Sequence, residues 1–281
     1  MIVITGGNGQ LGTELRHLLD QRNIPYVAAD IAEMDITKED DVRAFLTEVN
    51  ATTIYHCAAY TAVDKAEDEG KELNHLVNVV GTKNVASVAA ELGATIVYLS
   101  TDYVFDGTKL EEYTIEDDVN PKSEYGRSKY EGEVAIMESG APYYIVRTSW
   151  VFGQYGHNFV FTMQNLAKTR DTLTVVNDQH GRPTWTRNLA EFMTHLVDSH
   201  AEQGLYFFSN DNSCTWFDFA TEILKDTEVT VLPVTSDQFP QKAYRPKHSV
   251  MDLSKAKATG FHIPTWQEAL ETFLGQIDGN K

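Results

Sequence analysis

Residues 2–12 read IVITGGNGQLG, a short apolar run followed at once by a glycine-rich turn. The turn fits the spacing G-x-x-G-x-x-G from Gly6 to Gly12, and it also fits G-x-G-x-x-G from Gly7. Glycines that follow a strand and open a helix let the backbone approach a pyrophosphate, because no Cβ intervenes. The segment therefore predicts a dinucleotide-binding βα unit, with a tight turn that binds nothing as the ordinary alternative.

Short apolar runs continue to alternate with amphipathic stretches through the first 150 residues. We expect strands at 26–30, 53–58, 95–99 and 144–147, and helices at 10–21, 39–49 and 72–92. Strands that alternate with helices form a parallel sheet with both faces covered. The pattern predicts an α/β fold, with a Rossmann-type doubly wound parallel sheet over residues 1–150.

The pattern becomes less regular after about residue 150, where glycine, proline and asparagine interrupt shorter runs. Helical stretches recur at 159–168, 189–199 and 216–225. We expect residues 151–281 to form a smaller, mainly substrate-binding domain. Its boundary is expected to interleave, with 187–200 packing back on the Rossmann domain.

The composition of the 281 residues excludes several classes of protein. There are 23 basic and 41 acidic residues, a net charge of −18, which argues against binding nucleic acid or an anionic membrane surface. No run approaches the ~18 apolar residues of a membrane span, and the first strand begins beside Met1, so we expect a cytoplasmic protein. Cys57 and Cys214 form no metal or redox motif and are expected to be free thiols.

Asp30 closes the second expected strand. An acid at this place accepts hydrogen bonds from the adenosine ribose hydroxyls and repels a 2′-phosphate. Asp30 thus favours NADH, unless a nearby cation accommodates the phosphate of NADPH, and a simple loop acid is the ordinary alternative. The predicted cofactor is NADPH or NADH.

Tyr125 and Lys129 lie four residues apart in an expected helix, so their side chains share one face. An ammonium beside a phenol favours phenolate, and we expect Lys129 to lower the pKa of Tyr125 for acid–base work near neutral pH. This spacing is common by chance, and a solvated pair is the ordinary alternative. Thr101 stands at the carboxyl end of a buried strand, where its hydroxyl can hold a substrate carbonyl oxygen. Ser100 competes for this role, because neighbouring strand residues face opposite sides.

With these motifs in this order, the chain resembles the extended short-chain dehydrogenase/reductases. Over nearly its whole length it is similar to one family among them, the dTDP-4-dehydrorhamnose reductases. The strings that carry this likeness are 9–12 (GQLG), 58–67 (AAYTAVDKAE), 100–107 (STDYVFDG), 147–151 (RTSWV) and 177–179 (NDQ). The resemblance implies an NAD(P)H-dependent enzyme that reduces the C4 keto group of dTDP-4-dehydro-L-rhamnose to give dTDP-L-rhamnose, with Tyr125 as proton donor.

The resemblance also implies roles for particular residues. Thr101, Tyr125 and Lys129 are the implied catalytic residues. The implied cofactor-binding residues are Gly6, Gly9, Gln10, Leu11, Gly12, Asp30, Asp35, Ile36, Ala58, Ala59, Tyr60, Tyr125 and Lys129. The implied substrate-binding residues are Thr101, Asp102, Tyr103, Trp150, Asn158 and Arg245. Arg245 is a candidate clamp for the pyrophosphate, with a surface role as the ordinary alternative, as core packing is for Trp150.

The implied partner is a dTDP-linked 4-keto-6-deoxy sugar, with no nucleic acid and no membrane. Some family members pair as homodimers through a magnesium ion held by glutamates. Here residues 184–188 read TWTRN, and no glutamate precedes Glu191 in this region. A homodimer stays open, a metal-bridged form is not supported, and no metal is expected.

Two other functions fit the same fold. A catalytically silent nucleotide-binding regulatory subunit would lack the tyrosine–lysine pair, which is present here. A nucleotide-sugar epimerase or dehydratase remains open as well, since a dehydratase needs an acid beside the hydroxyl residue and Asp102 directly follows Thr101. The string around these residues resembles reductases, which favours reduction.

Overall fold

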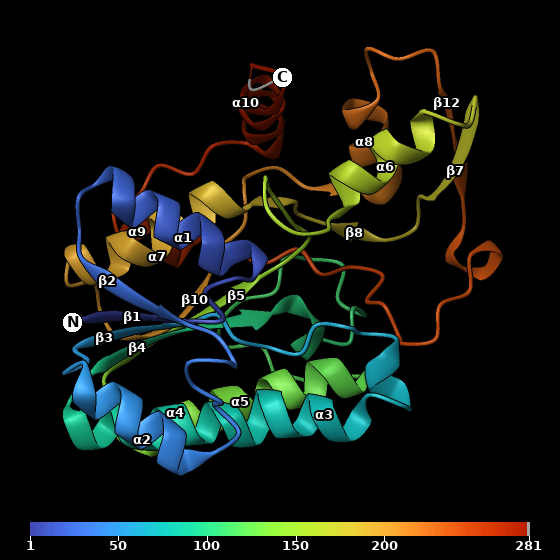
Figure 1. Cartoon of the computed structure of the whole chain (residues 1–281). Coiled ribbons are helices and arrows are strands. Elements are labelled where there is room, and N and C mark those ends of the chain that lie inside the picture. Colours follow the sequence, from blue (N-terminus) through green and yellow to red (C-terminus); the bar gives the residue numbers. More distant parts are fainter. Residues whose placement is uncertain (280–281) are drawn as a thin grey trace.

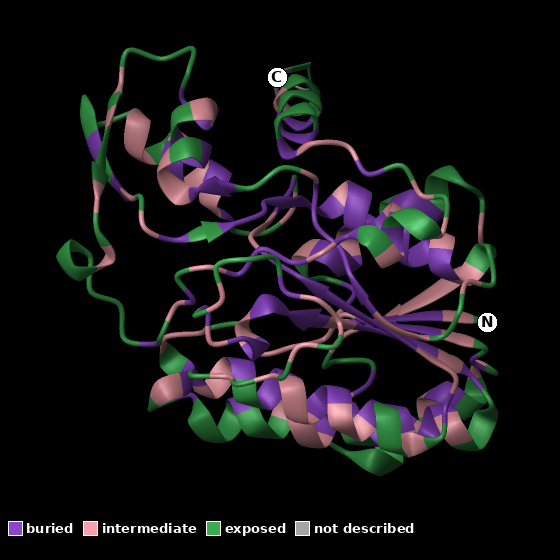
Figure 2. Ribbon diagram, turned by 180° about the vertical axis from the view of Figure 1, so that it is seen from behind, coloured by how far each residue is buried: buried purple, intermediate pink, exposed green. Residues whose placement is uncertain are grey.

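The computed structural model describes residues 1–279, apart from the side chain of residue 278. At its centre is a six-stranded sheet in which every neighbouring pair is parallel (Figure 1). In spatial order the strands are β10 (Gly204–Phe207), β5 (Tyr143–Thr148), β4 (Thr95–Thr101), β3 (Thr53–His56), β1 (Ile2–Thr5) and β2 (Tyr26–Ala29). The strands are largely buried, whereas the helices expose their outer faces (Figure 2).

Helices cover both faces of the sheet (Figure 1). One face carries α1 (Gln10–Gln21), α7 (Thr186–Asp198) and α9 (Ser254–Ala258), and the other carries α2 (Glu39–Glu48), α3 (Lys71–His75), α4 (Thr82–Leu92) and α5 (Glu124–Ser139). Successive strand residues point to opposite faces, so Ile4 joins the apolar cluster under α1 and α7 while Val3 joins the cluster under α2 and α4. The prediction of a doubly wound α/β fold is confirmed.

The single helix expected at 72–92 is three segments. A π-helical stretch, η2 (Leu76–Gly81), lies between α3 and α4. Within it the buried Asn78 accepts a hydrogen bond from Tyr60 N at 2.8 Å and donates to Tyr60 O at 3.0 Å. Periodicity alone does not reveal such a change of helix type, which occurs most often at functional sites. Here it ties the loop after β3 to the helix layer.

A third apolar cluster, built around Phe152, Leu173, Phe219 and Phe273, lies in the second half of the chain. The elements of this part are β6 (Val151–Phe152), α6 (Phe159–Ala167), β7 (Thr172–Val176), β8 (His180–Gly181), β9 (Thr184–Trp185), β11 (Cys214–Thr215), α8 (Trp216–Ile223), β12 (Thr230–Val234) and α10 (Trp266–Gly279). Its short strands form two-stranded sheets, such as the parallel pair of β7 and β12.

Parts of the second half return to the central sheet. β10 pairs with β5 as an edge strand, although no sequence feature had indicated a strand there. α7 packs against α1, where Leu189, Phe192 and Leu196 join the apolar cluster of that face. The sheet is therefore completed by residues that follow position 150. Within residues 1–279 no helix combines the length and apolar character that crossing a membrane requires.

Candidate active site

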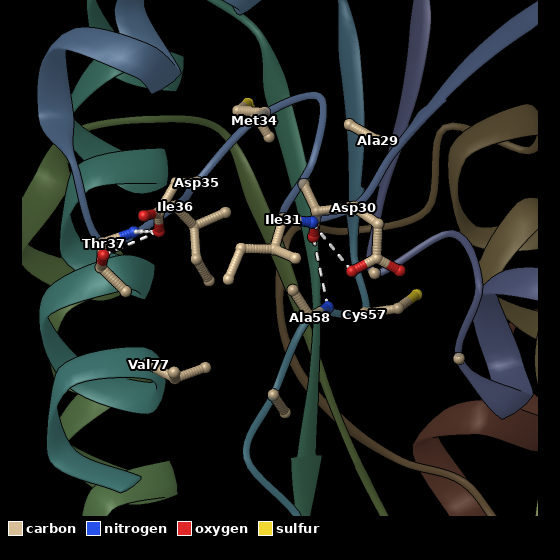
Figure 3. A pocket seen from close by; sticks show the side chains of 14 residues that line it. Ala29, Asp30, Ile31, Met34, Asp35, Ile36, Thr37, Cys57, Ala58 and Val77 are labelled. Atoms are coloured by element: carbon tan, nitrogen blue, oxygen red, sulfur yellow. Dashed lines mark hydrogen bonds between the residues drawn. The ribbon is translucent and has the colours of Figure 1, made fainter. Parts of the chain in front are cut away.

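A cavity of about 320 Å³ opens where β1 lies between β2 and β3 (Figure 3). The chain crosses from one side of β1 to the other at this point, and such a reversal of strand order is where open α/β sheets bind ligands. Residues of the expected cofactor set that line the cavity are Gly6, Gly9, Asp30, Asp35, Ile36, Ala58 and Ala59. Sequence reasoning had not named Ile31, Met34 or Val77, which line it too.

The glycine turn has both a packing role and an open helix end. Gly6 has φ +63°, and a Cβ there would lie 2.7 Å from the Ala58 backbone. A Cβ at Gly12 would lie 2.1 Å from the Gly6 carbonyl oxygen. α1 starts after Gly9 with no side-chain cap and no acid in its first turn, which leaves the positive end of the helix open to an anion. These residues fit the pyrophosphate of a dinucleotide.

Asn8, in the glycine turn, is contacted by an acid that follows β2 and by a cation of α1. Asp30 Oδ2 accepts from the Asn8 backbone N–H at 3.2 Å. Arg16 Nη1 donates to Asn8 Oδ1 at 3.1 Å and to the Gly7 carbonyl at 3.2 Å. Sequence reasoning missed Arg16, whose one signal is a basic residue in the helix that the glycine turn opens. Ile31 beside them is 75% exposed, which leaves an apolar surface for an adenine ring.

Several expected cofactor residues serve the protein's own structure. Asp35 Oδ1 accepts from Thr37 N at 3.1 Å and from Thr37 Oγ1 at 2.7 Å, and the hydroxyl bond holds the pKa of Asp35 below its ordinary value (Figure 3). Leu11 is buried in the apolar cluster under α1 and α7. Gln10 Oε1 accepts a hydrogen bond from Asn158 Nδ2 at 3.2 Å. Gln10, Leu11, Gly12 and Tyr60 do not line the 320 Å³ cavity.

Thr101 ends β4, and Tyr125 and Lys129 lie on α5, which packs against this strand with Lys129 Nζ 4.1 Å from the centroid of the Tyr98 ring. Ser123 caps α5 by accepting from Gly126 N at 3.1 Å, so the helix begins just before Tyr125. The Thr101 hydroxyl lies beside the Tyr125 phenol and donates to Asp102 Oδ1 at 3.2 Å. Ser100 instead donates to Glu133 Oε1 at 2.5 Å, on the other side of the strand. The structure therefore puts Thr101 beside the phenol, which sequence reasoning had left open between the two residues.

The expected pKa shift of Tyr125 was wrong in sign. Burial raises the pKa of Tyr125, the Asp102 charge raises it further, and the neighbouring Thr101 hydroxyl opposes both. Burial lowers the pKa of Lys129 to about 7, against the opposing charge of Glu133. A lysine that loses its charge near neutral pH stabilises a phenolate poorly. In this structure the phenol is therefore held in its protonated form, the form that can donate a proton.

Asp102 starts a short helix, η3 (Asp102–Val104), beside Thr101. It is 2% exposed, and burial raises its pKa to about 6 against the effect of the neighbouring Ser249 and Thr101 hydroxyls. Its Oδ2 has no hydrogen-bond partner within residues 1–279. A buried acceptor without a partner costs stability, so its presence here favours a ligand donor at this point.

A second cavity, of about 500 Å³, lies beside Tyr103 and is lined mainly by apolar side chains of α6, β7 and α8. The Tyr103 ring meets Tyr125 edge-on, with 5.8 Å between the ring centroids. Arg245 also lines this cavity, 5.6 Å from the Tyr103 centroid. The cavity thus combines apolar walls, among them Phe159 and Trp216, with two cations, Arg245 and Arg170.

Trp150 and Asn158 do not line the second cavity. Trp150 has φ +48°, rare for a large residue, and stacks on Trp216 with 3.7 Å between centroids. Strained backbone of this kind clusters at binding sites. Asn158 caps α6 by accepting from Phe161 N at 3.2 Å and donates to the Gly153 carbonyl at 2.7 Å. Its polar atoms are engaged within the protein.

A buried ion pair beneath the site was not foreseen. Arg147 Nε donates to Glu133 Oε1 at 2.8 Å, and Nη2 donates to Oε2 at 2.6 Å. Phe105 and Phe207 flank the guanidinium. The pair joins β5 to α5, the helix of Tyr125. The spacing of Glu133 four residues after Lys129 was the available signal.

No magnesium bridge was expected near residues 184–191. The carboxylates of Glu191 and Glu14 in this region lie beside the cation Arg187. Arg187 Nε pairs with Glu191 Oε1 at 2.7 Å, and its Nη1 lies 3.8 Å from Glu14 Oε1. In the part of the chain that the structure describes, no group of three or more His, Cys, Asp or Glu side chains is arranged to hold a metal ion.

Comparison with known proteins gives consistent results along the chain. The family described as RmlD substrate binding domain matches residues 1–278. A dTDP-4-dehydrorhamnose reductase from Aggregatibacter actinomycetemcomitans is 38% identical over 285 residues, covering 96% of this chain and 97% of that protein. A dTDP-4-keto-6-deoxy-D-glucose reductase from Streptomyces niveus is 37% identical, covering 95% of this chain and 94% of that protein.

Among solved structures, a dTDP-4-dehydrorhamnose reductase from Bacillus anthracis in complex with NADP has a TM-score of 0.94. It is 40% identical, and the match covers 98% of each chain. Identity at this level over the full length confirms the resemblance that the motifs had indicated. The chain therefore belongs to the dTDP-4-dehydrorhamnose reductase family.

Proposed function

We propose that the protein reduces the C4 keto group of dTDP-4-dehydro-L-rhamnose to the hydroxyl of dTDP-L-rhamnose, with NADPH or NADH as reductant. The observation that carries the proposal is the position of the Tyr125 phenol. It is buried beside Thr101, and its ring contacts Tyr103 at the wall of the apolar cavity. Lys129, on the same helix, lies near Cys57 of the dinucleotide cavity. The names of the relatives support the same activity.

The glycine turn fits a nicotinamide dinucleotide, which supplies hydride to the carbonyl carbon when bound. Gly6, Gly9 and the open start of α1 would hold its pyrophosphate. Asp30 would accept from the adenosine ribose, with Ile31 beside the adenine. The NADP that the B. anthracis relative holds supports this assignment.

Thr101 and Tyr125 would act on the substrate oxygen together. Both hydroxyls can donate to the C4 carbonyl oxygen, which polarises the carbonyl before the proton moves. Tyr125 Oη would then give its proton to O4. Lys129, with a pKa of about 7, is close enough to neutrality to return a proton to the phenolate through the site.

The second cavity would receive the nucleotide of the substrate. Phe159 and Trp216 offer aromatic faces to a thymine ring, and Arg245 offers a guanidinium to the diphosphate. The unpartnered Asp102 Oδ2 would accept a hydrogen bond from a sugar hydroxyl. Trp150, which has a strained backbone and stacks on Trp216, would contact the sugar. Asn158 would bind the sugar more weakly, because its polar atoms already form hydrogen bonds within the protein.

We also propose that the chain is divided into two functional parts. The two apolar clusters of the central sheet belong to the cofactor part, and the cluster around Phe152 belongs to the substrate part. Residues 1–150 form the cofactor part, and residues 151–281 are mainly the substrate part, with 187–200 on the cofactor side. The packing of α7 on α1 and of β10 on β5 supports the interleaved boundary. A cytoplasmic location is proposed as well, since the free thiols Cys57 and Cys214 fit a reducing compartment.

The test measures, by absorbance, the oxidation of NADPH and of NADH. The substrates are dTDP-4-keto-6-deoxy-L-mannose, which is the same compound as dTDP-4-dehydro-L-rhamnose, and its UDP and GDP counterparts. We expect turnover with the dTDP sugar to exceed that with the other two. No turnover with any of the three sugars would overturn the proposed function.

A second candidate substrate is the dTDP-4-keto-6-deoxy sugar of D-gluco configuration, which the name of the S. niveus relative favours. Thr101 and Tyr125 would act on its C4 oxygen in the same way. Including this sugar in the assay decides between the two, because the better substrate has the higher kcat/KM.

A further inference from the structure

A segment of the second half, residues 242–247, lies against the cofactor part, and the Asp64 carboxylate binds it there at two points. Asp64 Oδ1 accepts from Ala243 N at 2.9 Å. Asp64 Oδ2 accepts from Arg245 Nη2 at 2.8 Å and forms an ion pair with it. One side chain therefore fixes both the backbone of the segment and the direction of its arginine.

The segment has further contacts that do not involve Asp64. Tyr244 Oη donates to the Asp106 carbonyl at 2.7 Å. A Cβ at Gly107 would lie 2.6 Å from Pro246 Cα, so the two backbones are in close contact there. These contacts hold the segment in place, but none reaches the Arg245 guanidinium. The direction of that guanidinium depends on Asp64.

Arg245 is a long side chain with several rotamers, and only 14% of it is exposed. Within residues 1–279, Asp64 is the one hydrogen-bond partner of its guanidinium, and Nη1 is buried without a partner. The guanidinium stands over the Tyr103 ring at the wall of the second cavity. With Nη2 bound to Asp64, Nη1 is left for a ligand anion.

The turn that contains Asp64 also holds the catalytic helix. Glu67, at the end of the short helix η1 (Lys65–Glu67), accepts from Glu124 N at 2.9 Å. Glu124 is the first residue of α5 and precedes Tyr125. Residues 64–67 thus contact both the arginine of one cavity and the start of the helix that carries the proton donor.

We propose that Asp64 is a positioning residue that directs Arg245 toward the diphosphate of the nucleotide sugar. This inference rests on the proposed function and adds a determinant of substrate affinity to it. Asp64 does not touch the reacting atoms. Its effect is expected in substrate binding, with the chemical step unchanged.

Two effects of the Asp64 charge oppose one another. The carboxylate repels a diphosphate, which would make its removal favourable. It also forms a charged hydrogen bond that holds Arg245, and such bonds are stronger than those between neutral groups. The side chain is 47% exposed, so water screens the longer-range repulsion more than the direct contact. Loss of the contact is therefore the larger effect.

The experiment compares Asp64→Asn with Asp68→Asn by calorimetric titration of dTDP and of thymidine. Asp68 is in the same turn, is 49% exposed and pairs with Lys242, so its variant removes the same charge without touching Arg245. We expect Asp64→Asn to weaken dTDP binding about tenfold, with thymidine binding unchanged. In turnover, KM for the sugar should rise about tenfold while kcat stays within about twofold. Asp64→Glu should recover part of the affinity.

Equal dTDP affinities for Asp64→Asn and Asp68→Asn, or tighter binding by Asp64→Asn, would overturn the inference alone. So would equal losses for dTDP and thymidine, because these would indicate a general structural change. If the wild-type protein bound no dTDP and reduced no dTDP sugar, the proposed function would fail and the inference with it.

Discussion

The two walls of the site are built in different ways. On the cofactor side, Gly6, Asp30, Ala58 and Thr101 each lie at the carboxyl end of a strand of one parallel sheet. On the substrate side, Phe159, Trp216 and Arg245 come from a helix, another helix and a loop that share no sheet. The substrate wall has its own apolar cluster and reaches the cofactor side through contacts such as that of Arg245 with Asp64.

The difference shows how each wall is held in place. Parallel strands bring their carboxyl ends to one edge whatever their side chains, so the cofactor wall follows from the backbone. The substrate wall depends on individual side-chain contacts across large separations in sequence. Changes on one side should therefore leave binding on the other side intact, and this expectation can be tested residue by residue.

The largest effect is expected at the junction of the walls, in Tyr125→Phe. Loss of the phenol proton should lower kcat by roughly 10²–10⁴-fold, while NADPH and dTDP still bind. Tyr130→Phe, a tyrosine on the same helix, is the control and should retain turnover. Single-turnover kinetics and nucleotide titration measure the two properties separately. Near-normal turnover by Tyr125→Phe would assign the proton donor elsewhere.

Glu133→Gln tests whether the cofactor wall depends on internal support. The side chains of Glu133 and Arg147 are 1% and 4% exposed, and removal of one charge leaves the other buried without its partner. We expect a loss of about 3–5 kcal/mol in the free energy of unfolding, measured with urea. Glu131→Gln, on the same helix but 43% exposed, should change it by less than about 0.5 kcal/mol. Equal losses in the two variants would contradict the assigned role of the pair.

Arg16→Gln tests cofactor choice within the cofactor wall. The guanidinium beside Asn8 and Asp30 is placed to meet a 2′-phosphate, so its loss should weaken NADPH binding about tenfold and leave NADH binding nearly unchanged. Fluorescence titration of the reduced cofactors measures both without substrate. The affinity for dTDP should not change. A similar loss for both cofactors would indicate that Arg16 supports the turn itself.

The smallest effect is expected from Asp102, which lies between the two walls. It concerns the pH dependence of kcat/KM. Its pKa of about 6 means that the carboxylate, the better acceptor for a sugar hydroxyl, forms as the pH rises through 6. We expect kcat/KM to rise a few-fold across this range in the wild type, but not in Asp102→Asn. An unchanged rise in the variant would assign the titration to another group.

The same shift has a consequence for stability. Folding raises the pKa of Asp102 from 3.8, so the native state favours the protonated acid. The stability that this group contributes is present below pH ~4 and is lost as the pH rises through 6. Asp102→Asn should therefore unfold at a higher urea concentration than the wild type at pH 7, with little difference at pH 4.

The sequence predicted most of the cofactor part. The strands at 26–30, 53–58, 95–99 and 144–147 were located to within a few residues, because apolar runs buried on both faces are a strong local signal. The strand β10 was missed, since its four residues give no such signal. The π-helical stretch around Asn78 was missed because its apolar pattern is close to that of an α-helix.

The motifs by themselves determined the fold class, the family and the identity of Tyr125, Lys129 and Thr101 as candidates, since each depends on short spacings along the chain. Only the tertiary structure placed Thr101 rather than Ser100 beside the phenol, reversed the expected pKa shift of Tyr125, and joined Asp64 to Arg245. Burial and contact between distant segments decide these properties. A pKa depends on how much water packing removes, and no spacing in the sequence specifies that.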